Sequence, residues 1–164
     1  MPPAELLAYF SAERDGAWLL VAMGIGGLGL ATWLWHARHV HQAMAWPLLL
    51  FALLELGIGL GLAWRTPAQV ATLTAGLAAA PAATLATERA RMAAVNRNFR
   101  IVKVVETVLI VLGTALVVLG GRASLTGIGL GLVVEAALLL AFDVFAATRA
   151  AHYSAWLAAP ALGG

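Results

Sequence analysis

Four carboxylates interrupt otherwise apolar stretches of the sequence: Glu55, Glu106, Glu135 and Asp143. An acid inside a membrane-spanning segment costs several kcal/mol, so it faces protein or water rather than lipid. Counted at about 1.5 Å per residue, Glu55 lies about 13 Å from Trp46 and Glu135 about 16 Å from Ser124. Both positions are near the middle of an apolar stretch, and no Lys or Arg lies at that depth. The sequence therefore predicts a site that holds protons, cations or a cationic ligand.

A second interpretation of these acids is structural, with the carboxyl groups acting as polar contacts between helices. Possible partners for Glu55 and Glu135 would then be the hydroxyl groups of Thr32, Thr107 or Thr114. Glu106 and Asp143 lie nearer the ends of their stretches. We expect them to pair with the neighbouring basic residues Lys103, Arg100 and Arg149.

Three histidines, His36, His39 and His41, follow the first apolar stretch and could bind a metal through their imidazoles. The alternative is that they are interfacial residues beside nearby tryptophans. His152 is expected on the opposite side of the membrane, where it cannot complete a haem site, and no cofactor is expected. The sequence has no cysteine, no nucleophile elbow, no H-E-x-x-H and no P-loop, so we do not expect an enzyme.

The overall composition is that of an integral membrane protein. Of 164 residues, 62% are hydrophobic and only 11% are charged, and the mean hydropathy is +0.91. A soluble protein of this size has too much surface relative to its core to bury so much apolar material. These values exclude a soluble enzyme, a disordered chain and a nucleic-acid binder.

The apolar stretches predict an all-α membrane protein with four transmembrane helices in one bundle. The predicted spans cover residues 17–36, 45–64, 101–121 and 123–147, within a single membrane domain over 1–164, with interfacial segments at 1–16 and 148–164. Five of the six tryptophans flank a span, where the ring prefers the headgroup region: Trp18, Trp33, Trp35, Trp46 and Trp64.

Basic residues predict the orientation of the four spans. With four spans, both termini and the 65–100 connection share one side, which carries eight of the ten Lys and Arg residues. The positive-inside rule therefore places both termini in the cytoplasm, and we expect a bacterial inner (plasma) membrane.

The cytoplasmic connection, residues 67–100, is rich in Ala and Leu and is expected to be helical. Pro67 can start a helix and Pro81 should end or kink one, which predicts helices near 68–80 and 82–100. The second should continue without a break into the third span. Its apolar stripe, which includes Met92 and Phe99, is either a docking surface for a protein or lipid partner, or is packed against neighbouring helices.

Glycine pairs predict where helices pack closely. Gly127 and Gly131 share a face with Glu135, and the first span has its own pair. Gly57 and Gly61 lie opposite Glu55, so their span can pack on two sides. The predicted packing positions are Gly24, Gly27, Gly57, Gly61, Gly127 and Gly131. Because these exceed what one bundle needs, we expect a homo-oligomer, most simply a dimer.

Two functions of different classes follow from the sequence. One is a small transporter- or channel-like protein whose midplane carboxylates bind protons or cations. The alternative is a non-catalytic structural or accessory membrane subunit that works through helix packing and its cytoplasmic helix.

Overall fold

The computed structural model describes residues 3–37 and 40–159, which form helices joined by short turns. The long helices are α1 (Ala4–His36), α2 (Ala45–Ala79), α3 (Pro81–Leu119) and α4 (Ala123–Ala158), and a short 3₁₀ helix, η1 (Gln42–Met44), precedes α2. They contain 33 to 39 residues and are therefore about 50–58 Å long. Each is long and apolar enough to cross a membrane, which confirms the prediction of an all-helical protein with four such helices.

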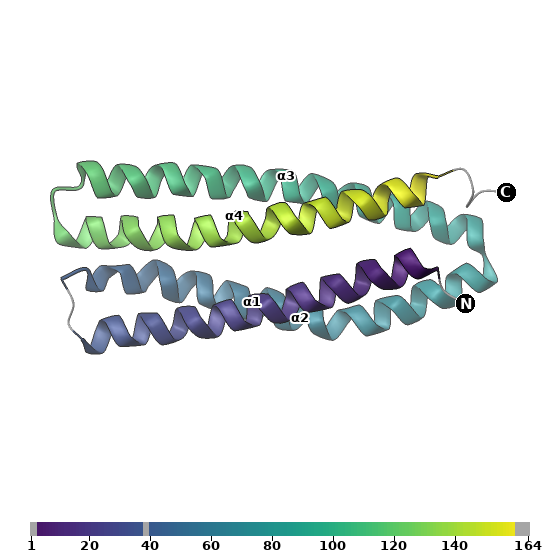
Figure 1. Ribbon diagram of the computed structural model, residues 1–164, viewed down its shortest axis with the longest axis horizontal. Coiled ribbons are helices and arrows are strands. Elements are labelled where there is room, and N and C mark those ends of the chain that lie inside the picture. The colour runs from purple at the N-terminus through teal and green to yellow at the C-terminus, as the bar shows by residue number, and fades with distance from the viewer. Residues whose placement is uncertain (1–2, 38–39, 160–164) are drawn as a thin grey trace.

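The helices form two hairpins that lie side by side (Figure 1). Within each hairpin the helices pack along one another, α1 with α2 and α3 with α4, while contacts between the hairpins are fewer and come mainly from α4 against η1 and α2. The start of α1, the end of α4 and the α2–α3 turn lie at one end, called here the terminal end. The other two turns lie at the opposite, loop end.

The turn between α2 and α3 is short because Pro81 is the first residue of α3. Proline lacks a backbone N–H, which a helix does not need at its first position. At the loop end Gly121 has φ of +59°, a conformation that favours glycine, and it allows α4 to reverse direction directly after α3. The predicted continuity of the 82–100 helix with the third span is confirmed.

The predicted helix start at Pro67 is wrong, since α2 runs through this proline without ending. Beyond it, Val70, Leu73 and Leu77 pack against a hydrophobic core. This packing holds the helix together across the one backbone hydrogen bond that proline cannot donate. From Ala4 onward the segment 1–16 is helical and continuous with the first apolar stretch in α1, while Met1 and Pro2 lie outside the described residues.

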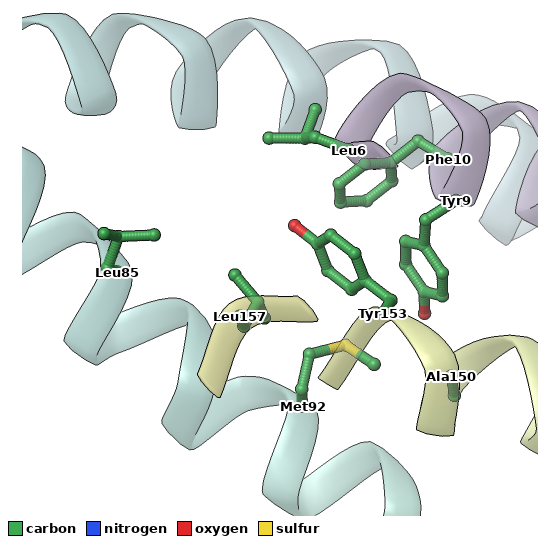
Figure 2. Packing of buried hydrophobic residues seen from close by; sticks show 8 residues of the cluster. All are labelled: Leu6, Tyr9, Phe10, Leu85, Met92, Ala150, Tyr153 and Leu157. Atoms are coloured by element: carbon green, nitrogen blue, oxygen red, sulfur yellow. The ribbon is translucent and has the colours of Figure 1, made fainter. Parts of the chain in front are cut away.

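All four helices continue together toward the terminal end and build this hydrophobic core there. We call this region, residues 4–16, 65–100 and 148–158, the terminal half, and the remainder the apolar half. Its core holds Leu6 and Phe10 of α1, Met92 of α3 and Tyr153 of α4 (Figure 2). Tyr153 stacks on Tyr9 with ring centroids 4.3 Å apart. The apolar stripe of α3 is thus packed against neighbouring helices, as the second interpretation expected.

Four of the predicted packing glycines lie where helices meet closely. A Cβ at Gly24 would come within 2.8 Å of the Ala52 carbonyl oxygen, and Gly27 lies against Ala52 as well. Gly127 and Gly131 face η1, where a Cβ would meet backbone atoms at 3.0 and 2.9 Å respectively. Gly57 and Gly61 differ, because nothing in the described part of the chain lies within 4 Å of a Cβ at either position.

Candidate functional site

Glu55 lies on α2, midway between Trp46 and Trp64, and its side chain points into the bundle. The residue is 2% exposed, and neither carboxyl oxygen has a hydrogen-bond partner among the described residues. A buried polar group without a partner costs more than one that is hydrogen-bonded. A buried polar group without a partner needs an explanation, and the binding of an ion or a ligand at that place is one.

Glu135 lies across the bundle on α4 and is also buried, at 4% exposed. Its carboxyl group is near enough for its charge to act on Glu55. One of its oxygens is 3.5 Å from the position that a Cβ on Gly27 would occupy. Gly27 thus allows α1 to approach Glu135 closely, and the Glu135 carboxyl group lies where α1 and α4 meet.

Glu106 of α3 and Asp143 of α4 form a second acidic pair, and their carboxyl groups are near enough to act on one another. One oxygen of Glu106, Oε2, is buried and has no hydrogen-bond partner among the described residues. The expected ion pairs with Lys103, Arg100 and Arg149 are wrong, since no such pair is formed within the described residues. Lys103 acts on both acids only through its charge.

The threonines considered as partners for these acids are occupied elsewhere. Thr32, Thr107 and Thr114 each donate the hydroxyl hydrogen to the carbonyl oxygen four residues earlier in their own helix, at 2.7–2.8 Å. A hydroxyl group used in this way points along its helix rather than toward a neighbouring one. The structure therefore gives Glu55 no threonine partner.

A cavity of about 260 Å³ brings three of the four predicted acids together. All four helices line it, and its wall includes Glu55, Glu106 and Asp143. Most of the remaining wall is apolar, with three phenylalanines, Phe51, Phe99 and Phe142. Glu135 does not line this cavity, so the acid that the sequence pairs with Glu55 lies behind its wall rather than in it.

Toward the terminal end the cavity is bordered by Tyr9, Glu13 and Arg149. Of these, Tyr9 and Glu13 were not selected from the sequence. Glu13 is mostly buried and forms a 3.9 Å ion pair with Arg65. Burial raises the pKa of the Glu13 carboxyl group above its usual range, and burial together with the charge of Glu13 raises the pKa of Tyr9 to about 12. The helical spacing of Tyr9, Glu13 and Leu20 on one face could have indicated that this side of α1 points inward.

The histidine cluster is described only in part. The Nδ1 atom of His36 bonds the carbonyl oxygen of Thr32 at 2.9 Å, while His39 lies outside the described residues. Within the residues that the structure describes, no group of three His, Cys, Asp or Glu side chains is arranged to hold a metal ion. The predicted histidine site therefore stays a prediction, and the candidate site described here is formed by the cavity acids.

Comparison with known proteins gives no further constraint on this site: no family model, no curated protein and no solved structure matches the chain.

Proposed function

We propose that this chain is a membrane-embedded protein whose central cavity binds protons and cations, with a transporter- or channel-like role. The observation that carries the proposal is Glu55, an acid at mid-depth, almost completely buried, unpartnered and facing a cavity. A buried carboxylate without a counter-ion is stable only if it takes up a proton or a cation. The Glu106–Asp143 pair, which adds two further acids to the wall of the same cavity, supports the same function.

The surface supports insertion into a bilayer. Five tryptophans are exposed in two groups, one near each end of the apolar half. Along α1 and α2 the groups are about 22–27 Å apart, close to the thickness of a bilayer's hydrocarbon core. Between them the exposed residues are mostly apolar, Glu55, Glu106 and Glu135 are buried, and Asp143 is partly buried. In α3 only 11% of the most apolar 18 residues are buried, yet Glu106 is 4% exposed.

The basic residues support an orientation with the terminal half in the cytoplasm of a bacterial cell. The chain has no native cysteine, so single cysteines can be labelled without background. Gln42→Cys should react with a membrane-impermeant maleimide added outside intact cells, while Thr74→Cys should react only after the cells are opened. The opposite pattern would reverse the proposed orientation.

Proton binding can be tested by infrared spectroscopy of the protein in lipid during a pH titration. A protonated carboxyl group has its own C=O stretching band, and Glu55→Gln should remove a titrating component of it. Glu5→Gln is the matched control, because Glu5 is exposed on α1 at the terminal end. A titration of the Glu55→Gln protein identical to that of the wild type would contradict the proposal.

Transport adds a second readout. Liposomes containing the wild-type protein should pass protons when a pH gradient is imposed, and Glu55→Gln should reduce this flux by at least about tenfold if Glu55 is on the path. Equal flux in both proteins would rule out a transport path through Glu55.

The second candidate function, an accessory membrane subunit, is favoured by one observation. Gly57 and Gly61 form an exposed, flat stretch of α2 that contacts nothing in the described chain. Such a face suits close packing against a helix of another subunit or of a second copy. Native mass spectrometry in mild detergents would test this candidate, and a protein that remains monomeric throughout would argue against it.

A further inference from the structure

We propose that the ligand of the central cavity is a monovalent organic cation with an aromatic or branched apolar body, which enters sideways from the bilayer between α2 and α3. This inference rests on the proposed function and specifies its ligand class and route. It is carried by the chemistry of the cavity wall, the availability of Glu55 and the exposure of residues at the cavity rim.

The wall is unsuited to a small inorganic cation. A hard cation such as Ca²⁺ needs about six to eight oxygen ligands to replace its hydration shell. Here the wall is made of helices, whose carbonyl oxygens are already used in helical hydrogen bonds, and most of the side chains are apolar. An inorganic ion would lose its water without sufficient replacement, whereas an organic cation carries little tightly held water.

Aromatic rings favour this ligand class further. Phe51, Phe99 and Phe142 line the same cavity as Glu55, and they come from three different helices. Aromatic rings attract organic cations through their electron-rich faces, and quaternary ammonium groups are bound in this way. Apolar neighbours such as Leu20 and Ile58 can then cover the body of the ligand.

The charges in the cavity indicate a single positive charge on the ligand. Glu106 and Asp143 are near enough to act on one another, and the charge of Lys103 acts on both. Arg149 is the one basic residue in the cavity wall among the described residues, and it lies toward the terminal end, beside Glu13. Within the described residues, Glu55 is thus the one carboxylate of the wall on which no basic residue acts, and neither of its oxygens has a hydrogen-bond partner. It can neutralise one charge.

The cavity reaches the side of the protein between α2 and α3. Leu54 and Ile58 of α2 and Val102 of α3 line it, and they are also 50%, 59% and 40% exposed. These two helices make few contacts with one another, whereas each packs extensively within its own hairpin. The rim thus lies on the apolar surface between the tryptophan groups, where a bilayer would surround it. A ligand that dissolves in the bilayer can enter there without crossing the terminal half.

The test measures binding of radiolabelled benzyltrimethylammonium to the full chain in lipid nanodiscs. The wild type should bind this cation, Glu55→Gln at least about tenfold more weakly, and the Glu5→Gln control as the wild type does. Unlabelled neopentylbenzene has nearly the same shape without the charge and should not displace the label. Tetramethylammonium has the charge without the ring and should displace it only at about tenfold higher concentration than unlabelled benzyltrimethylammonium.

The route has its own variants. Ile58→Trp should narrow the rim and slow the association of benzyltrimethylammonium, while Leu53→Trp, an exposed α2 residue outside the cavity wall, should leave the association rate unchanged. Equal association rates in the two variants would overturn the lateral route, and equal displacement by neopentylbenzene or by sodium ions would overturn the ligand class. If the infrared titration still depends on Glu55 in those cases, the proposed function stands without this inference. If it does not, the proposed function itself has failed.

Discussion

Two buried glutamates in this protein have nearly the same exposure and opposite surroundings. Glu88 in the terminal half is 5% exposed, and Arg91 donates to its two carboxyl oxygens at 2.8 and 2.6 Å. Glu55 in the apolar half is 2% exposed and has no partner for either oxygen among the described residues. Burial alone therefore does not distinguish a structural acid from an available one. The hydrogen-bond partners distinguish them, because a carboxylate that is already neutralised by an arginine does not require a proton or a cation.

The difference extends to the surroundings of each acid. Near Glu88 the guanidinium of Arg91 lies 5.5 Å from the ring centroid of Phe10 and connects the ion pair to the aromatic core. Around Glu55 the wall is apolar and partly empty. The terminal half thus resembles the interior of a soluble helical bundle, while the apolar half leaves space where a charged group is buried.

The largest effect should come from breaking the Glu88–Arg91 pair. Arg91→Ala leaves Glu88 buried and without its partner, so we expect the free energy of unfolding to fall by about 2–3 kcal/mol, somewhat less than for a fully buried pair because Arg91 is 26% exposed. Glu55→Gln removes no partner and should change stability much less. Denaturant unfolding in mild detergent measures both. Equal losses in the two variants would remove the distinction between these acids.

A second comparison sets the closely packed glycines against the open ones. A Cβ at Gly129 would lie 2.5 Å from the carbonyl oxygen of Gly113, so Gly129→Ala should separate α3 from α4 and reduce stability by about 1–3 kcal/mol. Gly57→Ala meets nothing in the described chain and should be neutral or stabilising by up to about 1 kcal/mol through helix propensity. A destabilising Gly57→Ala would indicate a further contact at this face, such as the proposed second copy.

The smallest effect concerns Glu13, which belongs to the terminal half and borders the cavity. Because burial raises its pKa in the folded protein, the folded state takes up a proton at a higher pH than the unfolded state does. Stability should therefore increase as pH falls from the raised folded pKa to the usual carboxyl value, and it should decrease as pH rises through that window. Glu13→Gln should flatten this dependence and change stability at neutral pH by less than about 1 kcal/mol. Melting temperatures of both proteins from pH 4 to 8 measure the effect. If the melting temperature of Glu13→Gln depends on pH as that of the wild type does, another group causes the dependence.

The sequence by itself determined the existence of the four long helices, the place of each acid along its helix and the single face shared by the α3 stripe, whereas the packing of that stripe was decided by the tertiary structure. These properties depend on local features of the sequence. A span requires about 20 consecutive apolar residues, and the residues on one helix face repeat every 3.6 positions. They do not depend on which neighbour a helix has. The close packing at Gly127 and Gly131 could be predicted in the same way, since small residues on one face of a membrane helix allow a neighbouring helix to approach closely.

Only the tertiary structure decided which acids meet. Matching depths predicted that Glu55 and Glu135 lie near one another, and the charge of Glu135 does act on Glu55. Depth did not predict that Glu55 lines a cavity with Glu106 and Asp143, while Glu135 does not line it. Depth fixes a position along the helix axis, whereas the partner depends on the rotation of each helix about that axis. That rotation is set by contacts such as Gly129 against Gly113, which involve residues far from the acids. The continuation of α2 through Pro67 was also decided by packing, because a terminal core supplied by other helices outweighs one missing backbone hydrogen bond.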